Sequence, residues 1–463
     1  MVFNSFVYFA FLAVVVVVFW HVAPRHRAAV LAVASAVFYG WWDWRLLGLM
    51  YAVVGTNYIG VRAIDAARSE RRRRAWLVWV AAADFGLLGA MKYYDFFARS
   101  LCEALTLAGG ARIEPRLLGW VLPVGISFYT FQLVAYAVDV YRRRLRAERD
   151  IVRFAAFVTF FPQLVAGPIE RAGHLLPQVG HGRAFRADEA VEGLRLVLWG
   201  LLKKVVLADN CAAVADRVFA APEAMSGADL WLGALCFAFQ IYGDFSGYSD
   251  MAVGSARLLG IGLTRNFRLP YFAATPADFW RRWHVSLMLW LRDYVYIPLG
   301  GSRRGPLRTA ANRTTVFLLS GLWHGAAWHF VAWGAWHAAL FPLDAALAKL
   351  RAPALLRRAA TLTGVLTGWV VFRAATLPAA MAMLAAMFRP DGFGTTALSR
   401  LPIVYIALFT AAEALARPNE NPVARLAELT GRRRALRWAF YYVLLLALFA
   451  LGGRPVAFVY FQF

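Results

Sequence analysis

The stretch "LLSGLWHGAAWHFVAWGAWHAALF", from Leu318 to Phe341, is apolar enough to lie in a lipid bilayer, yet it contains His324, His329 and His337. An ionisable side chain at membrane depth is costly, so it tends to face a cavity or a polar partner. The stretch therefore predicts a long apolar helix whose imidazole groups need either structural partners or a chemical role.

The whole chain has the composition of a membrane protein. Of its 463 residues, 61% are hydrophobic and 17% are charged, whereas about a quarter of an average soluble protein is charged. Apolar runs such as "FNSFVYFAFLAVVVVVFW" (Phe3 to Trp20) are long enough to cross about 30 Å of hydrocarbon as helices. Such runs recur along the chain, which predicts an all-α polytopic membrane protein in the lipid bilayer.

Basic segments indicate how the chain is oriented. Residues 23–27, 62–74 and 142–150 are rich in arginine, and cytoplasmic loops carry such an excess. Two short apolar runs joined by "WWDWR" (Trp41 to Arg45) separate the first two segments, and runs at 75–97 and 117–141 separate the next two. An even number of crossings between basic loops predicts an amino terminus outside the cytoplasm.

The net charge of +23 is also explained by arginine-rich cytoplasmic loops. The basic residues are not part of a recognisable nucleic-acid module, so no nucleic-acid partner is expected. The charge also favours attraction for anionic ligands or lipid head groups.

Beyond residue 153 the apolar pattern is less regular. The segment 154–178 is apolar but is interrupted by Pro162, Gly167 and Pro168, which predicts a re-entrant or broken segment buried in protein or lining a cavity. A basic, aromatic stretch at 264–313 is expected to lie partly in the cytoplasmic interface. The remaining spans are expected at 191–208, 230–259, 314–340, 362–372, 403–415 and 438–451. The total is roughly eleven to thirteen hydrophobic segments.

Three stretches could carry chemistry. In "PADFWRRWHVSLMLWLRDYVYIPLGGSRRG" (Pro276 to Gly305), His284 lies among tryptophan and arginine residues that could equally form an interfacial belt. In "YGDFSGYSDMAVG" (Tyr242 to Gly254), Asp244 and Asp250 lie in an apolar span. They either line an aqueous pocket or join helices through polar contacts.

The third stretch is the one around His324. Desolvation disfavours imidazolium, and a neutral imidazole can accept a proton from a hydroxyl nucleophile. A satisfied interior histidine is the plain alternative, and spacing alone does not choose among His324, His329 and His337. The three cysteines, Cys102, Cys211 and Cys236, lack paired metal-type spacing, so no metal site is expected.

Several ordered motifs together resemble the membrane-bound O-acyltransferases, in particular the bacterial branch that contains the alginate O-acetyltransferase membrane subunit. These motifs are "FFPQLVAGPIER", "YGDFSGYSDMAVG", "NFRLPYFA", "DFWRRWHVSLMLWLRDYVYIPLGG", "LSGLWHGAAWHFVAWG", "WVVFRA" and the ending "FVYFQF". They cover most of the chain in one order, which makes the resemblance specific.

The resemblance implies a single domain over 1–463, with amino-terminal helices to 150, a catalytic core at 151–345 and carboxy-terminal helices at 346–463, around a central tunnel. His324 matches the catalytic histidine of the W-H-G motif, and His284 matches the second active-site histidine. His329 and His337 match no catalytic position and are expected to serve packing or local hydrogen bonding. Met288 and Leu289 depart from the small polar residue common in relatives, which affects only the surroundings of His284.

The expected reaction is transfer of an acetyl group from cytoplasmic acetyl-CoA to a hydroxyl acceptor across the bacterial inner membrane, with a periplasmic amino terminus. His324 would remove the acceptor proton and His284 would orient groups or stabilise charge. A periplasmic SGNH-hydrolase-like partner would pass the group to an exopolysaccharide such as alginate. The residues expected to bind substrate or donor are Arg281, Arg282, Trp283, Asp244, Tyr248, Asp250, Trp323, Arg303 and Arg304.

Alternatives remain at this point. Transfer of D-alanine to teichoic acid from a carrier-protein thioester lies within the same family, and acylation of a lipid or sterol is a further option. A proton-coupled transporter would also use intramembrane histidines and aspartates, but it predicts inverted repeats with paired broken helices. The sequence contains one broken region without an evident counterpart.

Overall fold

The computed structural model describes the chain except for residues 110–112, 166, 181–182, 390–397, 417–420, 431–432 and 460–463. Within this described part the regular secondary structure is helical and no strand occurs, which confirms the all-α prediction. The described chain forms two compact units, and the single domain with divisions after residues 150 and 345 stays a prediction. Unit 1 comprises Met1–Arg186, Leu258–Leu263 and Gly325–Ala327, and unit 2 comprises Ala187–Arg257, Thr264–His324 and Trp328–Phe463.

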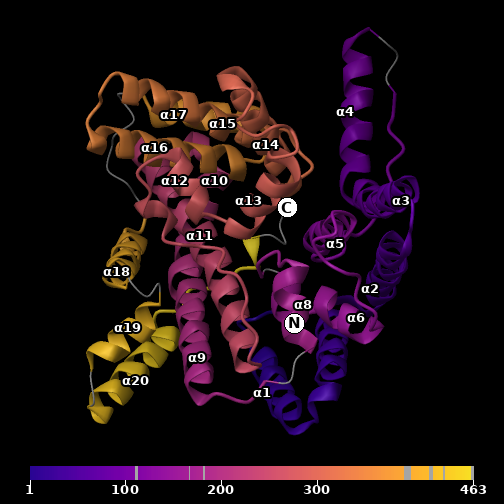
Figure 1. The fold of residues 1–463 in the computed structure, drawn as a ribbon. Helices are drawn as coiled ribbons and strands as arrows, with labels where there is room; N and C mark the ends of the chain where they lie inside the picture. The colour runs from indigo at the N-terminus through magenta and orange to yellow at the C-terminus, as the bar shows by residue number, and fades with distance from the viewer. Residues whose placement is uncertain are drawn as a thin grey trace. The chain divides into compact units, whose positions relative to one another are not determined.

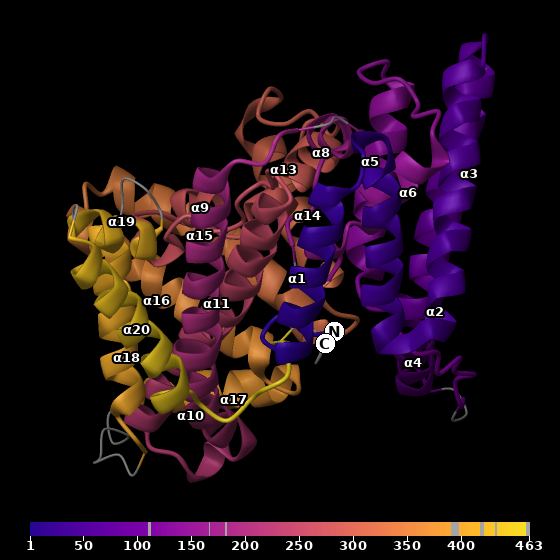
Figure 2. The same ribbon diagram turned by 90° about the horizontal axis from the view of Figure 1, so that it is seen from below.

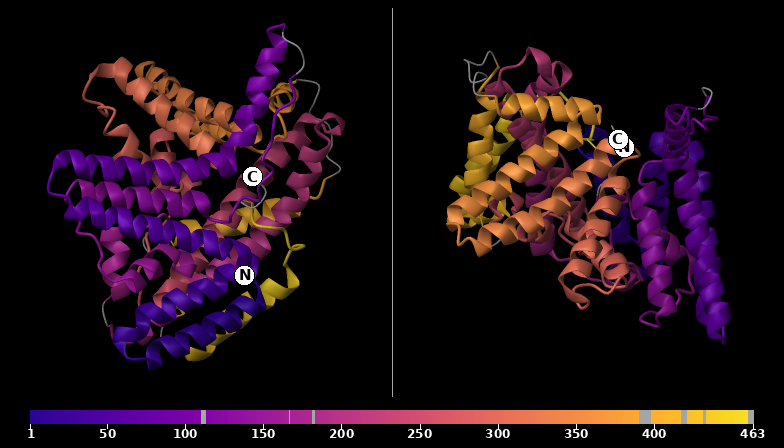
Figure 3. Two further views of the ribbon diagram at one scale, coloured as in Figure 1. Left: turned by 90° about the vertical axis from the view of Figure 1, so that its right-hand side faces the viewer. Right: turned by 90° about the horizontal axis from the view of Figure 1, so that it is seen from above.

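Unit 1 is built from long helices that run side by side, seen in indigo and purple in Figure 3. Its elements are α1 (Phe6–His21), η1 (Pro24–His26), α2 (Arg27–Ala66), α3 (Glu70–Leu88), the π-turn η2 (Gly89–Tyr93), α4 (Tyr94–Leu107), α5 (Ile126–Tyr141), α6 (Ile151–Thr159), α7 (Phe161–Leu164) and α8 (Ala172–Gly180). The predicted span at 117–141 was too long, because only its part in α5 is helical.

The element α2 is a helical hairpin. Its backbone leaves helical geometry at Asp43 (φ −154°, ψ 107°), and the Tyr51 hydroxyl donates to the Ala32 carbonyl at 3.4 Å although the two are 19 residues apart. The Asp43 carboxylate accepts from the backbone N–H of Arg45 at 2.9 Å, which caps the second arm. The two predicted runs on either side of "WWDWR" therefore exist as two antiparallel arms.

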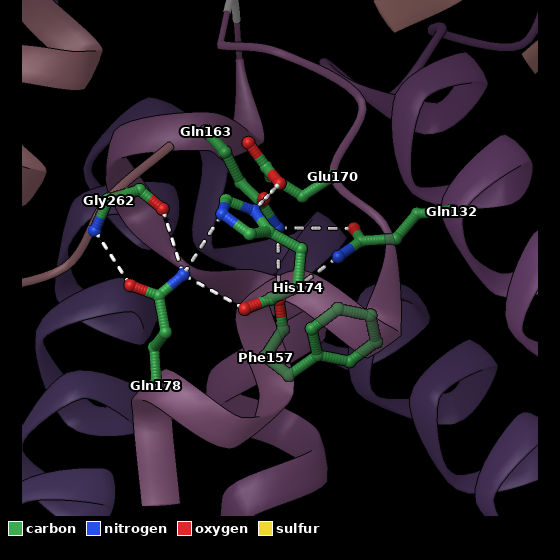
Figure 4. Close-up of polar contacts among 7 residues, drawn as sticks. All are labelled: Gln132, Phe157, Gln163, Glu170, His174, Gln178 and Gly262. Atoms are coloured by element: carbon green, nitrogen blue, oxygen red, sulfur yellow. Dashed lines mark hydrogen bonds and ion pairs between the residues drawn. The ribbon is translucent and has the colours of Figure 1, made fainter. Parts of the chain in front are cut away.

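The predicted broken segment is confirmed as α6, α7 and α8. Where α6 ends, the Phe157 carbonyl accepts hydrogen bonds from the buried side chains of Gln132 (3.2 Å) and Gln163 (3.0 Å), and Gln163 also donates to Gln132. Figure 4 shows this cluster beside the pair formed by Glu170 and His174, whose carboxylate and ring nitrogen are 2.7 Å apart. The two glutamine side chains thus satisfy the Phe157 carbonyl, which the end of the broken helix leaves without a helical partner.

Unit 2 contains the remaining elements (Figure 1). They are α9 (Ala187–Leu201), the π-turn η3 (Leu202–Ala208), α10 (Asp209–Ala220), η4 (Pro222–Ala224), α11 (Gly227–Leu258), η5 (Pro270–Phe272), α12 (Pro276–Arg282), α13 (Val285–Leu291), η6 (Arg292–Tyr296), α14 (Gly305–His324), α15 (Trp328–Lys349), α16 (Ala354–Arg373), α17 (Leu377–Met387), α18 (Leu401–Leu415), α19 (Pro422–Leu429) and α20 (Arg434–Ala450).

Glycines bring α9 and α11 into backbone contact, and the two helices lie side by side in Figure 2. A Cβ on Gly200 would lie 2.5 Å from the Gly247 carbonyl oxygen, and a Cβ on Gly254 would lie 2.5 Å from the Gly193 carbonyl oxygen. Small residues that let backbones approach are typical of helix packing in membranes. This contact fixes the position of α11, which carries Asp244 and Asp250.

The prediction of one long apolar helix around His324 was wrong. Helix α14 ends at His324, the chain turns, and α15 begins at Trp328. The two helices then pack antiparallel, because Gly321 lies against the Phe330 carbonyl and Gly334 lies against the Phe317 carbonyl. The hairpin lets each apolar helix bury one face on the other, and it places His324 at a helix end.

Two helical stretches in the described part of the chain are long and apolar enough to cross a membrane, Pro24–Ala66 and Glu70–Leu107. Shorter apolar helices are Phe6–His21, Leu377–Met387 and Leu401–Leu415. Breaks, turns and charged residues divide many of the other predicted hydrophobic segments, so they appear as shorter helices.

The α14–α15 contact yields a stability prediction. Gly321→Ala would place a Cβ 2.1 Å from the Phe330 carbonyl oxygen, so we expect a loss of about 1–3 kcal/mol in unfolding free energy from overpacking. Gly55→Ala is the matched control, since a Cβ at this helical position meets nothing within 4 Å. Thermal unfolding of both purified variants in detergent measures the difference, and an equal effect would contradict the packing argument.

Candidate functional site

His284 occupies a strained position between α12 and α13. Its backbone is left-handed (φ 44°, ψ 52°), which costs a residue with a Cβ about 1–3 kcal/mol. The following residues are held on Asn266: the Val285 N–H donates to the Asn266 carbonyl at 2.9 Å, and the Ser286 N–H donates to the Asn266 side chain at 3.1 Å. These bonds fix the turn and hold the His284 ring inside the protein, where the residue is 1% exposed.

His324 ends α14 and is 5% exposed. Its ring centre is 5.0 Å from that of Trp323, 5.1 Å from that of Trp333 and 5.4 Å from that of Phe372. The Trp323 indole also lies 5.5 Å from the His284 ring. Both predicted active-site histidines therefore contact the same indole within unit 2, although 40 positions separate them in the sequence.

An aromatic cluster surrounds these histidines. Trp283 is 1% exposed and lies 4.8 Å from Trp369, which in turn stacks on Trp333 at 5.9 Å. His337 is fully buried and lies 4.9 Å from both Trp280 and Trp333. The position of His337 agrees with the packing role expected for it, and the cluster encloses His324 in an apolar environment.

Asp244 and Asp250 of α11 both pair with lysines of η3. The Lys204 ammonium is 2.9 Å from Asp244 and 2.9 Å from Asp209, and the Lys203 ammonium is 2.6 Å from Asp250. Lys204 also donates to the Val456 carbonyl at 2.8 Å, while the Val459 N–H donates to Asp244 at 2.6 Å. These contacts match the helix-joining alternative and tie the carboxy-terminal strap, residues 456–459, to α11.

Tyr248 lies close to the same strap. Its ring centre is 4.3 Å from that of Phe458, and Phe245 links Phe458 at 6.2 Å to His284 at 4.8 Å. The first two residues of the "FVYFQF" motif thus pack beside the α11 motif, whereas Tyr460 to Phe463, like Ala166 of the "FFPQLVAGPIER" motif, lie outside the described residues.

The four arginines predicted to bind the donor are more exposed to solvent than the residues of this buried cluster. The Arg281 side chain is 72% exposed and Arg282 is 35% exposed, and both pair with Asp278, at 3.5 and 2.9 Å. Arg303 and Arg304 are exposed in the turn before α14. Their position is suited to contact with a soluble, charged molecule.

The sequence reasoning missed the buried lysines and Glu413. Lys203 and Lys204 are 4% and 1% exposed, and Glu413 of α18 accepts a hydrogen bond from the Tyr242 hydroxyl at 2.6 Å. The signal was present as "LLKKVVLAD" at 201–209, since two cations inside an apolar span call for anionic partners.

The Lys204 contacts predict a large stability effect. Lys204→Met would leave two carboxylates buried without their cation. Breaking a buried pair typically costs about 3–5 kcal/mol, so we expect the unfolding free energy to fall by about that amount. Arg425→Gln is the control, because its pair with Glu428 is exposed and such pairs contribute at most about 1 kcal/mol. Chemical unfolding in detergent compares the two, and a Lys204→Met variant as stable as the control would contradict this role.

Comparison with known proteins agrees with the motifs. The model of the MBOAT, membrane-bound O-acyltransferase family matches residues 140–387, which include both His284 and His324. The chain is 42% identical over 407 residues to the "Probable alginate O-acetylase AlgI" of Azotobacter vinelandii, covering 87% of this chain and 80% of that protein. The protein of the same name from Pseudomonas aeruginosa is 42% identical, with 87% and 77% covered.

A more distant relative is the "Peptidoglycan O-acetyltransferase" of Helicobacter pylori, which is 34% identical over 85% of this chain and 78% of its own length. The family match covers more than half of the chain, and the most similar of these relatives align along most of its length. The all-α polytopic chain therefore belongs to the membrane-bound O-acyltransferase family.

Proposed function

We propose that the protein is a membrane O-acetyltransferase that modifies a cell-surface polysaccharide. The observation that carries this proposal is the pair of buried histidines on the Trp323 indole, inside the segment that matches the family. Relatives whose names describe O-acetylation of alginate and of peptidoglycan support acetyl as the group and a polysaccharide as the acceptor.

In the proposed reaction His324 is the general base. Its enclosed ring, 5% exposed, favours a neutral imidazole, which removes the proton of an acceptor hydroxyl as the oxygen attacks the thioester carbonyl. The C–O bond forms, the C–S bond breaks, and the thiolate takes the proton from His324. Because the aromatic cluster encloses His324, its side chains must shift when the substrates enter.

His284 is proposed to donate a hydrogen bond to the oxyanion that develops on the carbonyl. A donor held rigidly before the reaction stabilises the transition state without reorganisation. The bonds from Val285 and Ser286 to Asn266 provide that rigidity. The strained backbone of His284 fits a residue positioned for function.

The donor is proposed to be acetyl-CoA, bound from the cytoplasm with its phosphates near Arg281, Arg282, Arg303 and Arg304. The acceptor would be a serine of a periplasmic SGNH-hydrolase-like partner, which passes the acetyl group to the polymer. The proposal includes a location in the bacterial inner membrane with the amino terminus in the periplasm.

A second candidate is D-alanyl transfer. The "Teichoic acid D-alanyltransferase" of Bacillus subtilis is 28% identical over 47% of this chain and 57% of its own length. Mass spectrometry of the modified polymer separates the candidates, because acetyl and D-alanyl esters differ in mass. On hydrolysis, the acetyl ester releases acetate and the D-alanyl ester releases an amino acid.

The role of His324 is tested by His324→Ala. We expect the ester content of the cell-surface polysaccharide to fall by at least about 100-fold, since a positioned base contributes two to four orders of magnitude. His329→Ala is the control, because His329 is half-buried and its ring centre lies 4.1 Å from that of Phe330, away from the proposed base. Unchanged ester content in a His324→Ala strain with normal protein level would refute the proposed role.

The role of His284 is tested by comparing His284→Gly with His284→Ala. Both remove the imidazole, so both are expected to lose transfer activity. Glycine tolerates the left-handed backbone, so we expect His284→Gly to be more stable than His284→Ala by about 1 kcal/mol. Thermal unfolding and ester analysis measure the two effects, and activity retained by either variant would contradict the oxyanion role.

A further inference from the structure

Unit 1 contains a cationic cavity of about 650 Å³. The end of α2, the start of α3 and the segment that follows α5 form its walls. Five arginines and one carboxylate line it: Arg62, Arg73, Arg143, Arg146, Arg149 and Asp65. Such an excess of positive charge favours an anionic ligand.

Two of these arginines and the carboxylate already have structural partners. Arg73 is buried, pairs with Glu70 at 3.3 Å and donates to the carbonyls of Val140 and Tyr141. Arg62 donates to the Tyr58 hydroxyl at 3.2 Å. Both therefore contribute charge to the wall; Arg73 also ties α3 to the end of α5, whereas the Arg62 bond stays within α2.

The other three arginines are exposed and available. In the part of the chain that the structure describes, the guanidinium groups of Arg143, Arg146 and Arg149 form no ion pair. Three such groups around one cavity can together bind a phosphate through charge-assisted hydrogen bonds.

The backbone that carries these arginines is held on neighbouring helices. The Glu148 N–H donates to the Tyr136 hydroxyl at 2.7 Å, the Ala147 N–H donates to Asp65 at 3.3 Å, and the Tyr58 hydroxyl donates to the Arg149 carbonyl. Residues 147–149 are thus fixed to α5 and α2. A preorganised segment loses less entropy when a ligand binds.

Apolar surface lies on the same helices within about two turns of the cavity. Ile59 of α2 is 62% exposed, and Trp76 and Trp79 of α3 are 37% and 45% exposed. Tryptophans next to basic residues at the end of an apolar helix are typical of the boundary between hydrocarbon and head groups. In a bilayer this arrangement would bring the arginines to the depth of the lipid phosphates.

We propose that this cavity binds the phosphate head group of an anionic phospholipid, with its acyl chains along the exposed faces of α2 and α3. The shared chemistry is phosphate recognition, which a soluble phosphorylated molecule could also satisfy. The apolar surface beside the cavity favours the lipid. The site does not depend on the proposed acetyl transfer.

The experiment uses the full chain, purified in a neutral detergent, and native mass spectrometry during titration with phosphatidylglycerol or phosphatidylcholine. The test variant is Arg143→Gln, Arg146→Gln and Arg149→Gln combined. The matched control is Arg71→Gln, Arg72→Gln and Arg74→Gln combined, which removes the same charge from exposed positions at the start of α3 that do not line the cavity.

We expect the unaltered protein to bind phosphatidylglycerol in preference to phosphatidylcholine. The cavity variant should bind it at least about ten-fold more weakly, while the control should change by less than about three-fold. A single Arg146→Glu variant, with unchanged thermal unfolding, gives the same direction if the triple variant folds poorly. Equal losses in the cavity and control variants would overturn the proposal.

Coenzyme A and inorganic phosphate serve as soluble competitors in the same titration. Continued phosphatidylglycerol binding in their presence at millimolar concentration supports the lipid assignment. Cavity-dependent binding of coenzyme A without preference for phosphatidylglycerol would overturn it and assign the phosphate site to a soluble ligand. Neither result depends on ester transfer, so failure here is distinguishable from failure of the proposed function.

Discussion

The cost of burying charge governs the centre of unit 2. Lys204 is 1% exposed, and its ammonium pairs with Asp209 and Asp244, each at 2.9 Å, and donates a hydrogen bond to the Val456 carbonyl at 2.8 Å. Removing such a group from water is favourable only when its partners are complete. The requirement joins η3, α10, α11 and residue 456 at one point, and α9 is held on α11 by glycine contacts.

Aromatic packing sets the geometry of the candidate site. His284 and His324 come from different helix ends, and both rings are directed to one indole because the surrounding aromatic residues fill the remaining space. Family membership and this geometry together favour acyl-group transfer over a proton relay.

Local sequence signals predicted much of the fold. Pro162, Gly167 and Pro168 marked the broken segment, and "WWDWR" marked the hairpin that turns at Asp43. The helix end at His324 was not predicted, because the stretch is apolar throughout and the turn depends on tertiary contacts of Gly321 and Gly334. Local composition does not reveal contacts between distant helices. For the same reason the partners of Asp244 and Asp250 were left open, and the motif resemblance rather than spacing singled out His284 and His324.

The attachment of residues 456–459 to Lys204 and Asp244 has a consequence for biosynthesis. Val459 follows Asp244 of α11 by 215 residues, so the buried charges of Lys204 and Asp244 lack the contacts of the strap when α11 is first made. Until the strap arrives, water, lipid head groups or an insertion factor must solvate those charges. The final assembly of unit 2 therefore follows the synthesis of residues 456–459.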